Sequence, residues 1–112
     1  MNNTNKLNLN IEKGSITFWT NACTIDWSGS SIVPFFEASF DGNSIFILKD
    51  SDANLKFFHV FFGKGRTDVE LNVKNLEFNE KHHIAITWSL ESKEIALYVD
   101  GGKLKAVQKI NY

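Results

Sequence analysis

The chain has 112 residues, enough for one domain with one core. Twelve Lys and Arg against thirteen Asp and Glu give a net charge of −1, so the sequence offers no strong field for nucleic acid and no polybasic patch for a membrane surface. No apolar run reaches the ~18 residues of a transmembrane helix. Ten Phe, three Trp and two Tyr favour pleated sheet, and we predict a single all-β domain over residues 1–112.

Short segments of alternating apolar and polar residues are separated by turns rich in Asn, Gly, Asp and Ser, which predicts β-strands. Helical periodicity never persists for the ~10 residues that a helix needs. Residues 1–6 are polar and expected to be frayed, a better explanation of the sequon at Asn2 than glycosylation. In chain order, the predicted strands are 7–11, 15–21, 32–40, 44–49, 55–62, 68–74, 81–90, 94–99 and 104–110.

Two of these strands carry aromatic residues whose faces can be predicted. Residues 55–62 are apolar on both faces, which indicates a central strand covered on both sides or a strand that faces a partner. In the predicted strand 15–21, Ile16 and Phe18 share one face and Trp19 lies on the other. We interpret Trp19 and Trp88 as packing residues, although one of them could line a concave sheet face.

The predicted hairpin of 81–90 and 94–99 is the most informative part of the chain. Its runs HHIAITW at 82–88 and YVDG at 98–101 resemble paired strands of the laminin-G-like jelly roll of the concanavalin A-like lectin and glucanase superfamily. GSITFW at 14–19 is similar to an early strand of that family. The resemblance implies an antiparallel jelly-roll β-sandwich. It also implies a shortened version, because such domains normally continue past the Asp-Gly turn through further strands.

Two loops carry candidate ligand-binding residues. In one, an exposed Trp27 could stack on a sugar ring while Asp26 accepts hydrogen bonds from sugar hydroxyls; the alternative is that Trp27 folds back over the core. In the other, Asp50, Asp52 and Asn54 have the alternating oxygen atoms that open a calcium loop, but the rest of an EF-hand is missing and a plain hairpin turn is the alternative. The candidate sugar contacts are therefore Asp26, Trp27, Asp50, Asp52 and Asn54. Of these, Asp50, Asp52 and Asn54 are also candidate calcium ligands.

We assign structural roles to the remaining polar candidates. His82 and His83 are adjacent, so on a strand they point to opposite faces and cannot chelate one ion together. His59 is expected to be a core histidine, and Asp100 a turn residue. Cys23 is the only cysteine, which excludes an intrachain disulfide, and we interpret it as a small buried hydrophobe.

Catalytic motifs are missing from the sequence. A retaining glycosidase needs two carboxylates ~5 Å apart, whereas Glu37 and Asp41 would be more than ~13 Å apart along a strand. No Ser lies in a nucleophile elbow. We therefore predict a protein that is not an enzyme, with glycoside hydrolysis as the least favoured alternative.

The leading functional prediction is a recognition module that binds a glycan through loops or a concave sheet face. The alternative is a structural or assembly domain that contacts another copy, or other domains of a larger protein, through uncovered sheet edges or a Phe-rich surface. Neither of these two predicted functions includes nucleic acid binding or membrane insertion. Because the N-terminus lacks the apolar region of a signal peptide, we expect the protein to be cytoplasmic, or extracellular if it is a piece of an exported chain.

Overall fold

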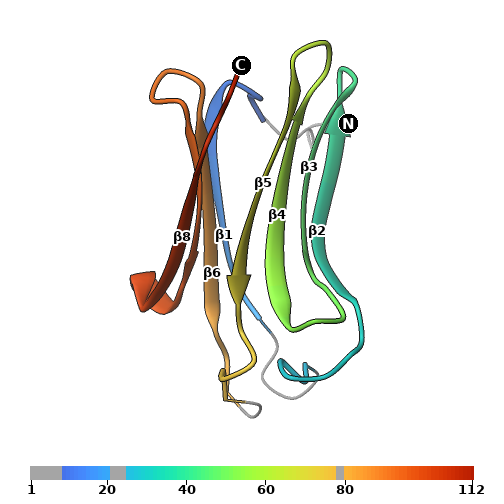
Figure 1. Ribbon diagram of the computed structural model, residues 1–112, viewed down its shortest axis with the longest axis vertical. Coiled ribbons are helices and arrows are strands. Elements are labelled where there is room, and N and C mark those ends of the chain that lie inside the picture. The colour runs from blue at the N-terminus through green and yellow to red at the C-terminus, as the bar shows by residue number, and fades with distance from the viewer. Residues whose placement is uncertain (1–8, 21–24, 78–79) are drawn as a thin grey trace, which may run out of the picture.

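The computed structural model describes residues 9–20, 25–77 and 80–112, and these form two packed antiparallel sheets (Figure 1). The first sheet has the strand order β1-β6-β7-β8 and the second the order β2-β3-β4-β5. The strands are β1 (Lys13–Trp19), β2 (Val33–Phe40), β3 (Asn43–Lys49), β4 (Asn54–Phe61), β5 (Gly65–Asn72), β6 (His83–Ser89), β7 (Glu94–Val99) and β8 (Leu104–Lys109). The predicted all-β sandwich is confirmed. Over these residues, no helix is long and apolar enough to span a membrane.

The core lies between the two sheets, where alternate residues of each strand meet. β3 contributes Ile45 and Ile47 to this layer, and β6 contributes Ile84 and Ile86, all at most 1% exposed. Successive residues of each strand thus point in turn to the core and to the outer face, which is why the sequence pattern predicted the strands. Each sheet therefore presents an outer face to solvent, and these two faces differ in composition.

Trp88, on β6, is the central aromatic side chain of the core and is 2% exposed. Its indole N–H donates to the carbonyl oxygen of Asn10 at 2.7 Å. Gly14 on β1 pairs with Trp88, and a Cβ at this glycine would lie 2.5 Å from the indole ring. A larger residue at position 14 would therefore displace the indole. The packing role predicted for Trp88 is confirmed.

The first predicted strand, 7–11, is wrong over residues 9–11, which form no strand. The Asn10 side chain instead accepts the backbone N–H of Glu12 at 2.8 Å, making a tight turn before β1. The carbonyl oxygen of Asn10 is hydrogen-bonded to the side chain of Trp88, and that of Ile11 to the side chain of His59. These carbonyl groups are therefore not part of a β-sheet hydrogen-bond ladder. Residues 7–8 lie outside the described residues, as do residues 1–6, for which fraying was predicted, the sequon at Asn2 and Cys23.

Candidate functional site

Trp27 lies in the core and does not present a ring face to solvent. Its indole is 2% exposed, stacks on Phe35 with ring centroids 5.9 Å apart, and meets the edge of the His82 ring at 5.5 Å. Sugar stacking on Trp27 is incompatible with this burial, so the structure supports the alternative in which the indole caps the core. Its loop neighbour Asp26 is exposed and accepts hydrogen bonds from the backbone and hydroxyl of Ser28.

The buried side chain of Lys49, on β3, is hydrogen-bonded to the loop that contains Asp26 and Trp27. The ammonium group donates to the carbonyl oxygens of Gly29 at 2.8 Å, Ser31 at 2.8 Å and Asp50 at 2.9 Å. These three acceptors satisfy the three N–H donors of the ammonium, and the residue is 0% exposed. Lys49 thus acts as a structural cation that holds the loop and the following turn in place.

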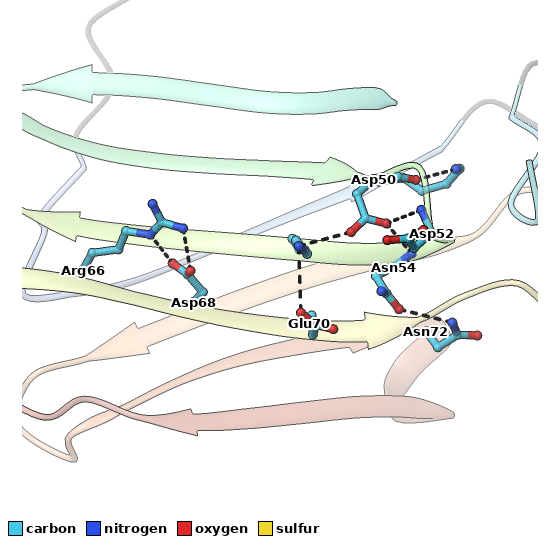
Figure 2. Close-up of polar contacts among 9 residues, drawn as sticks. Asp50, Asp52, Asn54, Arg66, Asp68, Glu70 and Asn72 are labelled. Atoms are coloured by element: carbon cyan, nitrogen blue, oxygen red, sulfur yellow. Dashed lines mark hydrogen bonds and ion pairs between the residues drawn. The ribbon is translucent and has the colours of Figure 1, made fainter. Parts of the chain in front are cut away.

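The turn between β3 and β4 holds the three candidate calcium ligands, and Figure 2 shows how they are used. One oxygen of Asp50 accepts the backbone N–H groups of Asp52 at 2.9 Å and Asn54 at 3.0 Å. The other oxygen lies 3.2 Å from the Lys56 ammonium. Burial by itself would raise the pKa of Asp50, but these hydrogen bonds and the Lys56 charge outweigh it and lower the pKa. Asn54 accepts a further hydrogen bond from Asn72 at 3.2 Å.

These contacts do not fit a calcium site. A calcium ion needs six or more oxygen ligands, whereas the Asp50 carboxylate already binds two N–H donors and an ammonium group. Within the described ranges, no group of three or more His, Cys, Asp or Glu side chains converges. The arrangement is that of the plain hairpin turn, in which Asp50 caps the backbone.

The exposed aromatic residue of the first sheet is Trp19, at the end of β1. Its side chain is 66% exposed and lies against the His83 ring of β6, with centroids 5.0 Å apart in an edge arrangement. The packing role predicted for Trp19 is therefore wrong, because the residue lies on the outer face, opposite Ile16 and Phe18. Ser15 and Thr17 share that face, and this polar majority is a signal in the sequence that could have placed Trp19 outside.

Two hollows lie on this outer face. One, of about 480 Å³, is lined by residues that offer an indole, an imidazole, two carboxylates and two ammonium groups: Trp19, His83, Glu80, Asp100, Lys81 and Lys103. The other, of about 390 Å³, has a floor of small side chains, Ser15 on β1, Thr87 on β6 and Ala96 on β7, with Tyr98 at its side. The register places Ser15 beside Thr87 and Thr87 beside Ala96. Small residues at three adjacent positions leave this part of the sheet uncovered.

Asp100, which lines the hollow beside Trp19, is hydrogen-bonded to the buried His82. One Asp100 oxygen lies 2.7 Å from His82 Nδ1, and the other accepts the His83 backbone N–H at 2.9 Å. His82 Nε2 faces the carbonyl oxygen of Glu77 at 3.0 Å. Both partners are acceptors, so both hydrogen bonds form only when both ring nitrogens carry a proton, which favours the imidazolium form. Burial would lower the pKa of His82, but the hydrogen bonds to Asp100 and Glu77 outweigh it and raise the pKa.

The structural roles predicted for His82 and Asp100 are thus confirmed, and their direct contact was not foreseen. Asp100 has a backbone φ of 54°, the left-handed conformation expected of an Asp-Gly turn. His82 faces the interior while His83 faces the outer surface, as their adjacency predicted.

No protein-family model, no curated protein and no solved structure matches this chain. The resemblance to laminin-G-like domains therefore depends on the runs at 14–19, 82–88 and 98–101 alone. These runs lie on β1, β6 and the end of β7, which are neighbours in one sheet.

Proposed function

We propose that this protein is a non-catalytic module that binds a glycan on the outer face of the β1-β6-β7-β8 sheet. The observation that carries the proposal is Trp19, whose indole is 66% exposed on a regular strand rather than on a loop. An exposed indole on a rigid element provides a flat apolar surface on which the C–H face of a pyranose can stack. Tryptophan is also enriched at binding interfaces, where its ring supplies apolar area and its N–H a polar contact.

The surroundings of Trp19 supply the polar part of sugar recognition. Sugar hydroxyls donate and accept hydrogen bonds, and the adjoining hollow offers the carboxylate of Glu80 as an acceptor and the ammonium groups of Lys81 and Lys103 as donors. Its volume of about 480 Å³ is within the range of small-molecule sites. The proposal includes the narrower assignment to a laminin-G-like jelly roll, which the three sequence motifs support.

A glycan array followed by calorimetry with the best ligand tests the proposal. Trp19→Ala should weaken binding at least tenfold, equivalent to about 1.4 kcal/mol, because the stacking surface is removed. Phe62→Ala is the matched control, since Phe62 is 71% exposed but extends from the end of β4, in the other sheet. Chelation of calcium should leave binding unchanged. Equal affinity of the Trp19→Ala protein, or binding of no glycan at all, would contradict the proposal.

A second candidate function is assembly, favoured by the outer face of the β2-β3-β4-β5 sheet. There Phe46 stacks on Phe58 with centroids 4.4 Å apart, and the Arg66 guanidinium lies 4.9 Å above the Phe58 ring. Phe62, just past the end of β4 and next to Gly42, adds a third aromatic ring to the surface of this sheet and is largely exposed. Light scattering of the wild type and of Phe62→Ser tests this candidate, since an oligomer held by these aromatic rings should dissociate when Phe62 becomes polar.

A further inference from the structure

The four strands at the sheet margins differ in how well their free edges are protected against pairing with another strand. β2 contains Pro34 and a register shift between Pro34 and Phe36, and both features disrupt a pairing edge. β5 and β8 lie close together where the two sheets meet. β1 has neither proline nor bulge, and all seven of its residues pair with β6 in one unbroken register. Among the described residues, β6 is the only strand that pairs with β1.

The outward-facing backbone groups of β1 can be identified from its ladder with β6. The Thr20 N–H donates to the His82 carbonyl, and the Leu90 N–H donates to the Glu12 carbonyl, both at 2.8 Å. Hydrogen-bonded positions alternate in an antiparallel pair, so the even-numbered residues of β1 face β6. The N–H and C=O groups of the odd-numbered residues, Ser15 and Thr17 among them, point away from the sheet. No described strand pairs with this row, and an unpaired row of backbone groups is a template for another strand.

We propose that the free edge of β1 pairs with β1 of a second copy of this chain, joining the two four-stranded sheets into one sheet across a two-fold axis. In an antiparallel pairing, two odd-numbered residues must oppose each other for these outward groups to bond. The register centred on Ile16 meets this condition and uses the whole strand. It places Ile16 on the two-fold axis and Ser15 opposite Thr17 of the second copy.

The side chains of β1 match each other in this register. Ser15 and Thr17 form a hydroxyl pair on the outer face, which is a favourable cross-strand combination. Gly14 lies opposite Phe18, so a residue without a side chain faces the largest residue on the inner side of the strand. Lys13 lies opposite Trp19, where an ammonium group can approach the indole face. In an isologous dimer, both copies contribute the same surface, and each residue of that surface meets its complement on the other copy. The proposed pairing of β1 has this property.

Burial along β1 is also consistent with a missing neighbour. Ile16 and Phe18 point into the sandwich but are only partly buried, whereas Ile86 and Ile84, opposite them on β6, are 0% exposed. A strand added beyond β1 would cover the remaining apolar surface of both residues. The proposed dimer does not depend on sugar binding, and it would place Lys13 of the second copy beside the hollow at Trp19.

Sedimentation equilibrium tests the proposal, with Cys23→Ser as the parent protein so that no disulfide can link two chains. The parent should sediment at twice the mass of one chain. Thr17→Pro should sediment as a monomer with an unchanged circular dichroism spectrum, because the N–H that proline removes points away from β6. Thr17→Val keeps that N–H and the strand preference, so it should remain a dimer. A monomeric parent at its highest soluble concentration, or a Thr17→Pro dimer, would overturn the proposal.

Cross-linking provides a second measurement that remains informative if Thr17→Pro does not fold. In the Cys23→Ser background, Ile16→Cys places a thiol opposite its own copy, at the ~4.5–5.5 Å Cβ separation of directly opposed residues. It should form a disulfide-linked dimer under mild oxidation. Thr17→Cys is the control, since its thiol lies opposite Ser15 and should cross-link far more slowly. Equal rates for the two variants, or no cross-linked dimer with Ile16→Cys, would overturn the proposed register.

Discussion

His59 on β4 and His82 just before β6 are both buried histidines, yet their surroundings shift the two pKa values in opposite directions. Both are buried, and both are hydrogen-bonded through each ring nitrogen. His59 faces the carbonyl oxygen of Ile11 at 2.8 Å and the hydroxyl group of Tyr112 at 3.4 Å. A hydroxyl group can donate to an unprotonated nitrogen, so the His59 ring is satisfied when neutral. Burial lowers the pKa of His59 accordingly.

His82 has no such donor, because its partners are a carboxylate and a carbonyl oxygen. The comparison shows that burial alone does not decide the charge of a histidine. The hydrogen-bond partners and the neighbouring Asp100 charge also contribute. It follows that replacing the two rings should cost different amounts of stability, and that their contributions should change in opposite directions with pH.

The largest expected effect comes from replacing each ring with one that cannot form hydrogen bonds. His82→Phe should lower the free energy of unfolding by about 3 kcal/mol at pH ~6, because the Asp100 carboxylate loses its charged partner. His59→Phe should lower it by about 1 kcal/mol, since one neutral hydrogen bond to Ile11 is lost. Urea denaturation of the two variants measures the difference. Equal losses, or a larger loss for His59→Phe, would contradict the larger contribution expected from His82.

A smaller effect is expected when the pH is varied. The raised pKa of His82 means that its contribution to stability is complete below its unfolded pKa of ~6.5 and is lost as the pH rises through the folded value. The lowered pKa of His59 means that its contribution is present above ~6.5 and is lost as the pH falls through the folded value.

Urea midpoints measured from pH ~5 to ~8 should therefore show that His82→Phe removes part of the alkaline decline, while His59→Phe removes part of the acid decline. Asp100→Asn is the control for the His82 side: it removes the carboxylate and should weaken the alkaline decline without affecting the acid side. Identical pH profiles for wild type and His82→Phe would contradict the imidazolium assignment.

The smallest effect is expected at Tyr112. Tyr112→Phe keeps the ring that lies edge-on to Phe61 and removes only the long hydrogen bond to His59. The free energy of unfolding should change by less than about 0.5 kcal/mol. A loss above about 1.5 kcal/mol in urea denaturation would mean that this hydroxyl group is a principal partner of His59, comparable to the Ile11 carbonyl.

Much of the fold could be predicted because alternation is a local property of the chain. Residues 55–62 are apolar on both faces, and residues 55–61 lie in β4, an inner strand of its sheet. Leu7, Leu9 and Ile11 alternate equally well, but the prediction failed at residues 9–11. There, the Asn10 and Ile11 carbonyl groups bond to Trp88 and His59, which are far away in the sequence.

The candidate site was harder to predict, because exposure depends on residues that fold over a side chain. Trp27 follows an Asp in a Ser/Gly-rich loop and has the local features of an exposed indole, but Phe35 and His82 enclose it. Asp50 has the spacing of a metal ligand, but its oxygens are used by its own turn and by Lys56. Trp19 is exposed because it lies on the outer face at the end of β1, where the His83 ring lies edge-on against it, a tertiary property that strand periodicity only partly reveals.

The burial of Lys49 makes its amine a chemical reporter. Reagents that acylate amines react with the accessible, unprotonated form, and in the folded protein this ammonium group is enclosed by three carbonyl oxygens. Its acylation should therefore be much slower than that of the exposed Lys13 or Lys105. The ratio of these rates, followed by mass spectrometry, would measure how often the 26–31 loop detaches from β3 while the rest of the protein stays folded.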